Sequence, residues 1–557
     1  MAVDYRKADA TEESLHRIFT VPEAPDSTLG RIEKDISENL NAFLQTHIAA
    51  REKPLAEIEK DFSSAALPES PSFVSDHTHF LLDKLVAQSV HTSAPSFIGH
   101  MTSALPYFLM PLSKIMIGLN QNLVKIETSK AFTPLERQVL GMLHNLIYQE
   151  DDSFYQQWMH SANHSLGAFC SGGTIANITA LWVARNNALK PDGHFKGVAQ
   201  EGLFRAMKHY GYDDLAILVS ERGHYSLKKA ADILGIGREC VIPVKADNNN
   251  RISIPELKAK MAELKANNIK PFAIIGVAGT TETGNIDPLD ELADIAEQHG
   301  CHFHVDAAWG GATLMSNTYR PMLKGIERAD SVTIDAHKQL YVPMGAGMVI
   351  FKNPALMTAI EHHAEYILRK GSKDLGSHTL EGSRSGMAML LYASLNIISR
   401  PGYEMLINNS IDKAKYFAKL VTDNPNFELI SEPELCLLTY RFVPERTQQA
   451  LVIASDEDKE TLLDALNDLT KFIQKRQRES GKSFVSRTRL TPEKWNRKIT
   501  TVLRVVLANP LTTENILQDV LDEQQAIAKQ SIISYPQIQA LTEKILNENH
   551  SKGSDAS

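Results

Sequence analysis

The chain has few cysteines for its length. Cys170, Cys240, Cys301 and Cys436 are the four among 557 residues, and they form neither a CxxC pair nor the spacing of a zinc site. A disulfide framework and a bound metal are therefore not expected. This cysteine usage fits a reducing compartment.

A surplus of positive charge and long apolar runs are also missing. With 58 basic against 67 acidic side chains the formal net charge is -9, which gives no electrostatic reason to bind nucleic acid or an anionic membrane surface. The apolar runs are shorter than a membrane-spanning helix, and the first residues, MAVDYRKADATEESLHRIF, lack the apolar centre of a signal peptide. We expect a cytoplasmic protein with neither a membrane nor a nucleic-acid partner.

Short apolar runs alternate with helical segments in the middle of the chain. The runs are LAILVS, FAIIGVAG, CHFHVDAA and SVTIDA, at 215–220, 272–279, 301–308 and 331–336. Helices are predicted at 133–149, 174–190, 255–267 and 288–299. Short buried strands between helices are typical of a parallel sheet, so the pattern predicts an α/β fold.

The texture of the sequence differs on the two sides of this region. Residues 1–95 contain polar helical stretches broken by prolines, which predicts an N-terminal helical segment before a large α/β domain at 96–395. Beyond it, strand-like runs flank a charged helix near 456–477, which predicts a smaller α+β domain at 396–546. The polar residues 547–557 are expected to form a disordered tail.

Three motifs carry polar residues at positions where α/β folds bind ligands. In FCSGGTIAN, Gly173 and Thr174 open a helix, whose backbone N–H groups and positive end favour a phosphate. Asp306 ends an apolar run in HVDAAWGG, at the edge where open α/β sheets bind ligands. Lys338 follows another apolar run in SVTIDAHKQL. Each motif also has an ordinary structural interpretation when it is taken alone.

The order of the motifs is more specific than any one of them. SGGTIAN, SERGHYSLKKA, AGTTETGNIDPL, HVDAAWGG, DAHK and EGSRSG follow one another along the chain. Together they resemble the group II pyridoxal-phosphate-dependent amino-acid decarboxylases, and they look nearest to the bacterial aspartate 1-decarboxylases of that family. The resemblance spans about residues 95–400, with a looser echo at 503–514. It implies a fold-type I enzyme with a mostly parallel, seven-stranded sheet flanked by helices.

The resemblance implies pyridoxal 5'-phosphate as the cofactor and three catalytic residues. Lys338 would hold the cofactor as a Schiff base. Asp306 would pair with the pyridine nitrogen and keep it protonated. His224 would stack on the face of the ring and is also a candidate for assisting the chemical step.

Further residues are expected around the cofactor by the same resemblance. The set expected at the phosphate or near the ring is Gly173, Thr174, Thr281, Ala308, Asp335 and His337. Some relatives carry asparagine where this chain has Asp335. Because a carboxylate repels a phosphate, Asp335 either opposes the phosphate or orients a neighbouring donor, and both interpretations stay open. For Thr281 a simple turn role also stays open.

Candidate substrate residues come from three segments. Arg384 in EGSRSG is the natural cation for the α-carboxylate, because a guanidinium gives bidentate contact, although a structural arginine fits this position equally well. Phe97 and His100, in PSFIGHMTSAL, resemble the substrate-side segment of the family.

The mobile loop expected at 364–384 holds the third group of candidates. Several relatives carry a tyrosine there that protonates the product carbon, whereas counting back from Arg384 places Lys373 at that position. Tyr366 lies too early to take its place. His378 or a residue of a partner subunit therefore stays open as the proton donor.

The activity implied is α-decarboxylation of L-aspartate to β-alanine and CO2, which would supply pantothenate synthesis. Decarboxylation of L-glutamate to 4-aminobutyrate is the alternative, because one methylene separates two substrates by only about 1–3 kcal/mol. Another pyridoxal-phosphate decarboxylase or a carbon–carbon lyase is a further alternative. A non-enzymatic role would predict the loss of Lys338 or Asp306, and both are present. The family also implies a homodimer with active sites at the subunit interface.

Overall fold

The computed structural model describes residues 28–46, 49–51, 53–364, 368 and 371–554. Packing divides the chain into two compact units, each built from stretches that are far apart in the sequence. The larger unit comprises Leu105–Arg441 and Thr488–Pro510, and the other comprises Met1–Ala104, Phe442–Arg487 and Leu511–Ser557. The domain boundaries at 95, 395 and 546 stay predictions.

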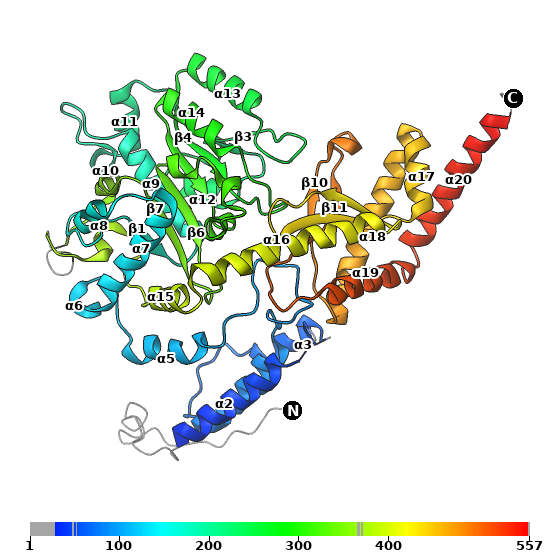
Figure 1. The fold of residues 1–557 in the computed structure, drawn as a ribbon, viewed down its shortest axis with the longest axis horizontal. Helices are drawn as coiled ribbons and strands as arrows, with labels where there is room; N and C mark the ends of the chain where they lie inside the picture. The colour runs from blue at the N-terminus through cyan, green and yellow to red at the C-terminus, as the bar shows by residue number, and fades with distance from the viewer. Residues whose placement is uncertain (1–27, 47–48, 52, 365–367, 369–370, 555–557) are drawn as a thin grey trace. The chain divides into compact units, whose positions relative to one another are not determined.

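A seven-stranded sheet forms the centre of the larger unit (Figure 1). Its strand order is β1-β7-β6-β5-β4-β2-β3, with bounds, in that order, Gly167–Cys170, Gly347–Phe351, Ser331–Asp335, His302–Asp306, Ile269–Val277, Asp214–Ser220 and Val241–Val244. Strand β7 runs antiparallel to both of its neighbours, and the pairs from β6 to β3 are parallel. The mostly parallel sheet of seven strands expected from the sequence is confirmed.

Helices flank this sheet, and four of them lie where the sequence predicts helices. The helices of this region are α7 (Phe132–Tyr148), α8 (Asp152–Trp158), α9 (Gly173–Ala188), α10 (Val198–Glu201), α11 (Leu203–Tyr210), α12 (Ser226–Ile233), α13 (Ile254–Ala266) and α14 (Leu289–His299). The four are α7, α9, α13 and α14, which match the helices predicted at 133–149, 174–190, 255–267 and 288–299. The start of α13 shows why the sequence is informative. Ser253 accepts a hydrogen bond from the backbone N–H of Glu256, and Pro255 lies in the first turn, where its missing N–H has no consequence.

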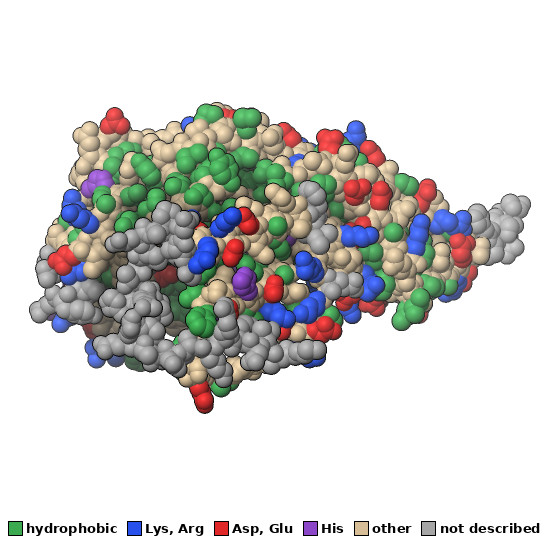
Figure 2. Space-filling view, turned by 90° about the horizontal axis from the view of Figure 1, so that it is seen from below, with side chains coloured by type: hydrophobic (Ala, Val, Ile, Leu, Met, Phe, Trp, Pro, Cys, Tyr) green, Lys and Arg blue, Asp and Glu red, His purple; other side chains and the backbone are tan. Residues whose placement is uncertain are grey.

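Helix α5 (Leu109–Leu119) differs from these helices because much of its apolar surface is exposed. Tyr107, just before it, is 81% exposed, and Ile117 is 69% exposed. The other helices of the larger unit are α6 (Ile126–Ser129), α15 (Ala388–Ile397) and α16 (Ser399–Asp423). In Figure 2, which looks from below the view of Figure 1, hydrophobic side chains gather on one face of the molecule. Large exposed apolar patches on folded proteins commonly mark interaction sites.

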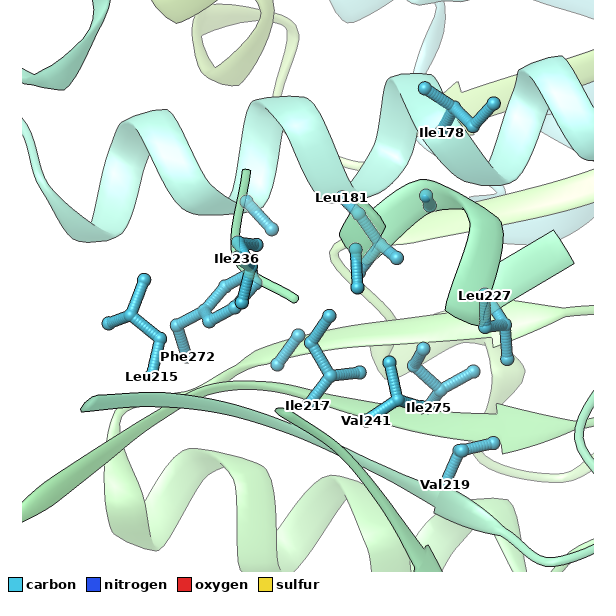
Figure 3. Packing of buried hydrophobic residues seen from close by; sticks show 14 of the residues in the cluster. Ile178, Leu181, Leu215, Ile217, Val219, Leu227, Ile236, Val241, Phe272 and Ile275 are labelled. Carbon is cyan, nitrogen blue, oxygen red and sulfur yellow. The ribbon is translucent and has the colours of Figure 1, made fainter. Parts of the chain in front are cut away.

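Apolar side chains fix α9 and α12 on the sheet (Figure 3). Ile178 and Leu181 of α9 and Leu227 of α12 pack with Ile217 and Ile275 of the strands, and none is more than 2% exposed. Full burial of one such side chain contributes about 1.5–3 kcal/mol. Because α9 follows β1 and α12 follows β2, this packing holds the first turn of α9 and the loop before α12 near the carboxyl ends of the strands.

The C-terminal strands form a second, smaller sheet. Its order is β10-β11-β9-β8, with bounds Ser486–Leu490, Thr500–Val506, Leu437–Phe442 and Phe427–Ser431. Strands β11 and β9 pair antiparallel. The loop between β11 and the following helix carries the NP dipeptide of the sequence echo at 503–514.

The other unit is mainly helical. Its helices are α2 (Thr28–Leu44), α3 (Leu55–Ile58), α4 (Val74–Phe80), α17 (Glu445–Ile453), α18 (Asp456–Ser480), α19 (Glu514–Lys529) and α20 (Ser534–Ser554). Helix α20 continues to Ser554, past residue 547 where a disordered tail is expected to start, and the boundary of that tail stays a prediction. No proline or glycine interrupts the helix between Pro536 and Gly553. Among the described helices of either unit, none is long and apolar enough to cross a membrane.

Candidate active site

Two aspartates end adjacent parallel strands of the large sheet. Asp306 is the last residue of β5 and Asp335 is the last residue of β6. Their side chains are buried, at 6% and 4% exposed. Lys338 and His337 follow β6 directly, and His224 lies in the loop between β2 and α12. The structure thus places these five predicted residues at the carboxyl edge of one sheet, where open α/β sheets bind ligands.

Asp335 lies between the two basic side chains that follow it. Its Oδ2 is 3.0 Å from Nζ of Lys338 and 3.6 Å from Nε2 of His337. His337 donates through Nδ1 to the carbonyl of Ala346 at 2.8 Å, because a carbonyl can only accept. The other carboxylate oxygen of Asp335, Oδ1, is buried without a hydrogen-bond partner among the described residues. Such an atom costs free energy unless a ligand or a proton satisfies it.

Glycines bring the first turn of α9 against this carboxylate. A Cβ on Gly173 would lie 2.8 Å from Asp335 Oδ2 and 3.3 Å from the Cβ of Ala308, and a Cβ on Gly347 would lie 2.6 Å from Asp335 Oδ1. Only residues without a Cβ fit such spacing. The first N–H groups of a helix have no partner within the helix, so this turn, with the Thr174 hydroxyl, can bind a phosphate.

Asp306 is held by neutral donors. Its Oδ2 accepts a hydrogen bond from Nδ2 of Asn177 at 2.8 Å, and its Oδ1 accepts one from the backbone N–H of Ala308 at 3.2 Å. Neither bond neutralises the charge. The carboxylate is therefore oriented and remains available to pair with a protonated ring nitrogen.

His224 is connected to the same cluster through Ser226. Nδ1 of His224 lies 2.8 Å from the Ser226 hydroxyl. Burial lowers the pKa of His224, and the nearby Asp306 carboxylate partly opposes this change. The imidazole is therefore neutral near pH 7, and a neutral ring suits stacking on an aromatic cofactor.

Taken together, these side chains fit pyridoxal 5'-phosphate. A primary amine, an oriented buried carboxylate and a glycine-lined helix N-terminus are the groups that its aldehyde, pyridine nitrogen and phosphate require. Lys338, Asp306 and the turn at Gly173 supply them. The Asp335 carboxylate is not expected beside a phosphate, because the two negative charges repel each other.

The side chain of Arg504 contacts the loop that contains Thr281. Arg504 of β11, 7% exposed, donates through Nε to the carbonyl of Thr281 at 2.7 Å. Burial lowers the pKa of Arg504 to about 10, and the neighbouring Glu282 opposes this. Sequence reasoning did not select Arg504, although it lies within the echo at 503–514.

Arg384 is engaged in a buried ion pair. Its two terminal nitrogens donate to the two oxygens of Glu136 on α7, at 2.7 and 3.1 Å. Burial alone would lower the pKa of Arg384, but the Glu136 carboxylate raises it overall. Both side chains are at most 7% exposed. A bidentate pair of this kind fills the face that a substrate carboxylate would use, so the substrate role of Arg384 stays a prediction.

The remaining substrate candidates lie outside this cluster or outside the described residues. Phe97 stacks on Phe484 in the other compact unit, which also contains His100. Lys373 is exposed, and its carbonyl accepts a hydrogen bond from Arg137. Tyr366 lies outside the described residues. The roles of these residues stay predictions.

His378 is buried next to Ser377. Its Nδ1 lies 2.8 Å from the Ser377 hydroxyl, and burial lowers its pKa to about 4. A histidine with so low a pKa carries no proton to donate from an imidazolium at neutral pH. The role of His378 as the proton donor of the loop stays a prediction.

The fold and this cluster define the class of fold-type I pyridoxal-phosphate enzymes, and solved structures show the same fold. The chain superposes on the glutamate decarboxylase domain of a Vibrio parahaemolyticus diaminobutyrate-pyruvate transaminase and L-2,4-diaminobutyrate decarboxylase with a TM-score of 0.76 and 21% identity, covering 94% of this chain and 100% of that chain. Mouse CSAD gives a TM-score of 0.78 at 24% identity, covering 91% of this chain and 99% of that chain.

Within this class the chain belongs to one family. The pyridoxal-dependent decarboxylase conserved domain matches residues 59–443. A protein of Aliivibrio fischeri named aspartate 1-decarboxylase is 72% identical over 547 residues, 98% of this chain and 100% of that protein. An acidic amino acid decarboxylase of Bos taurus is 30% identical over 67% of this chain and 68% of its own length. The expected family, enzyme class and cofactor are confirmed.

Proposed function

We propose that this protein removes the α-carboxylate of L-aspartate, giving β-alanine and CO2. The observation that carries the proposal is the 72% identity to the Aliivibrio fischeri aspartate 1-decarboxylase across 98% of the chain. Relatives at about 30% identity are named for acidic substrates too, including a cysteine sulfinic acid decarboxylase of mouse. An acidic amino acid is therefore the substrate class that the relatives support.

The residues of the site have separate roles in this reaction. When bound, pyridoxal 5'-phosphate supplies an electron sink for the pair released as the bond to the carboxylate breaks. Lys338 binds the cofactor through its amine, and Asp306 keeps the positive charge of the ring nitrogen in place. The first turn of α9 at Gly173 and Thr174 holds the phosphate. His224 fixes the plane of the ring.

Arg504 is the cation that we assign to a substrate carboxylate. It reaches the Thr281 loop, whose Glu282 interacts electrostatically with both Arg504 and His224. Arg384 donates through both terminal nitrogens to the Glu136 carboxylate. A carboxylate bound by a fixed guanidinium is held in one orientation, and orientation decides which bond at the α-carbon breaks.

The substrate is tested with purified, cofactor-loaded protein given L-aspartate or L-glutamate in separate reactions. Released CO2 and the amine product are measured, with Lys338→Ala as the blank. β-Alanine from aspartate, with little product from glutamate, is expected. Formation of 4-aminobutyrate at a higher kcat/KM would replace aspartate by glutamate. Absence of product from both, with cofactor absorbance retained, would overturn the acidic substrate but not the family.

The assignment of Arg504 is tested with two matched variants. Arg504→Lys keeps the positive charge but loses the planar guanidinium that can bind a carboxylate through two nitrogens. KM for aspartate is therefore expected to rise about tenfold or more. Arg384→Lys breaks the pair with Glu136, so the melting temperature is expected to fall while KM of the folded protein stays near the wild-type value. The opposite pattern would return the substrate role to Arg384.

We also propose that the protein acts as a homodimer. Exposed apolar side chains of α5 support this, because Ile115, Ile117 and Leu119, with Tyr107 just before the helix, are exposed to water in a single chain. Light scattering of the wild type is expected to give twice the chain mass. Ile117→Glu is expected to shift the protein toward monomer, and a monomeric wild type would contradict the proposal.

A cytoplasmic location is proposed on the basis of the thiols. Cys170, Cys240, Cys301 and Cys436 are all free, and three of them are buried. Free buried thiols persist in a reducing compartment. Fractionation of cells that express the protein is expected to place it with cytoplasmic markers, and recovery with the periplasm would overturn this.

A further inference from the structure

A buried hydrogen-bond network lies behind the two cofactor residues Asp306 and His224. Asn177, 1% exposed on α9, stands at its branch point. Its Nδ2 lies 2.8 Å from Asp306 Oδ2 and 3.1 Å from the Ser226 hydroxyl, and its Oδ1 lies 3.1 Å from Nε2 of His304. One amide thus contacts three other side chains.

The charge of Asp306 decides how this amide is oriented. An ionised carboxylate only accepts hydrogen bonds, so the Asn177 nitrogen must face it, and the amide oxygen must face His304. That oxygen accepts only if Nε2 of His304 carries a proton. Burial lowers the pKa of His304 to about 4, so the ring is neutral and its Nδ1 accepts from the Ser331 hydroxyl at 2.8 Å. The His304 proton is therefore on Nε2.

The other branch has a fixed direction too. The Ser226 hydroxyl accepts from Asn177, which leaves its own proton to point at Nδ1 of His224, 2.8 Å away. The backbone N–H of Ser226 also points at Nδ1, at 3.3 Å. Two donors on Nδ1 require a lone pair there. In the neutral ring of His224 the proton is consequently on Nε2, the nitrogen on the far side from Ser226.

We propose that Asn177 is a positioning residue that sets both cofactor contacts at once: it orients the Asp306 carboxylate and, through Ser226, presents His224 as an N–H donor at Nε2. Buried networks with every member satisfied gain rigidity, and loss of the branch point leaves several polar atoms without partners. The inference concerns the family reaction and does not depend on which acid is decarboxylated.

The test compares two buried asparagines of the same helix. Asn186, 4% exposed, donates to the carbonyl of Ala359 at 2.8 Å and accepts from Arg185, with no link to Asp306. Asn177→Ala and Asn186→Ala each remove a buried amide. Both are expected to lower the melting temperature, so stability alone does not separate the two roles.

Cofactor binding and kinetics separate them. For Asn177→Ala the dissociation constant of pyridoxal 5'-phosphate, followed by absorbance without substrate, is expected to rise about tenfold or more, and kcat is expected to fall by a similar factor with KM little changed. For Asn186→Ala both are expected to stay within about twofold of the wild type. Equal changes in the two variants, or no change in Asn177→Ala, would overturn the proposal.

The proton position is measured independently of activity. In holoenzyme labelled with 15N-histidine, the His224 signals are identified by their loss in His224→Gln. The wild type is expected to show a protonated Nε2 and an unprotonated Nδ1 at pH 7. In Asn177→Asp a second carboxyl faces Asp306, so cofactor binding is expected to become strongly dependent on pH. A wild-type His224 with its proton on Nδ1 would overturn the assigned direction of the network.

Discussion

Asp306 and Asp335 occupy equivalent places in the fold yet have opposite surroundings. Both end parallel strands that are neighbours in the sheet, and both are at most 6% exposed. Asp306 has a donor on each oxygen, and both donors are neutral. Asp335 has Lys338 and His337 near one oxygen and no hydrogen-bond partner, among the described residues, for the other.

The difference indicates two kinds of buried carboxylate. A carboxylate held by neutral donors keeps its full charge for a ligand cation, which suits a pyridine nitrogen. Asp335 instead has the Lys338 amine near one oxygen, while its other oxygen is buried without a hydrogen-bond partner among the described residues. The charge of Asp335 is therefore matched within the protein, whereas that of Asp306 is not.

The strongest test of this contrast is Asp306→Asn. The variant keeps the shape but places a neutral group at the ring nitrogen, so kcat is expected to fall about a thousandfold. Cofactor binding is expected to weaken as well. Steady-state kinetics and absorbance of the bound cofactor measure the two effects. Activity within tenfold of the wild type would show that the charge of Asp306 is not required.

Glu136 offers a third buried carboxylate for comparison, one that is fully matched by Arg384. Glu136→Gln would leave the Arg384 guanidinium buried without a counter-charge, which is expected to lower the free energy of unfolding by about 3–5 kcal/mol. Urea unfolding measures this loss. An unchanged midpoint would mean that Arg384 finds another anion, and the substrate assignment would then return to it.

Sequence reasoning located the residues that lie in contiguous motifs at strand ends. Asp306 ends a short apolar run, and Lys338 and Gly173 follow such runs; the carboxyl edge of a parallel sheet is the place where these segments meet. Arg384 is predicted to bind a substrate carboxylate because a guanidinium gives bidentate contact, and a structural role fits it equally well. Its partner, Glu136, lies 248 positions earlier, on a helix that only the folded chain brings to it.

Asn177 and Ser226 show a second limit of the sequence. Both stand inside motifs that were recognised, but their roles depend on hydrogen bonds across 129 and 49 positions. An asparagine in a helix and a serine after a histidine have many ordinary explanations. Only the geometry around Asp306 selects one of them, because the direction of each hydrogen bond in the network follows from the charge of this distant residue of the sequence.

His304 belongs to the network of neutral groups behind Asp306. The pH dependence of stability tests whether His304 is neutral in the folded protein. The pKa of His304 is lowered from 6.5 to about 4 by burial. As the pH falls below 6.5 the unfolded chain gains a proton that the folded chain does not, so stability present above this pH is lost progressively toward pH 4. Wild type is expected to lose up to about 3 kcal/mol more than His304→Gln over this range. Urea unfolding at several pH values measures this, and parallel losses would show that His304 is charged in the folded state.

The smallest expected effect concerns Asp335, and its sign carries the information. In Asp335→Asn the ion pair with Lys338 is lost and so is the negative charge beside the turn at Gly173. The phosphate then meets less repulsion, so the cofactor dissociation constant is expected to fall about tenfold, or about 1.4 kcal/mol. Titration of the apoprotein by absorbance measures it, with Asp306→Asn as the control that moves in the opposite direction. Weaker binding in Asp335→Asn would mean that the carboxylate serves the phosphate indirectly, by orienting His337, whose Nε2 lies 3.6 Å away.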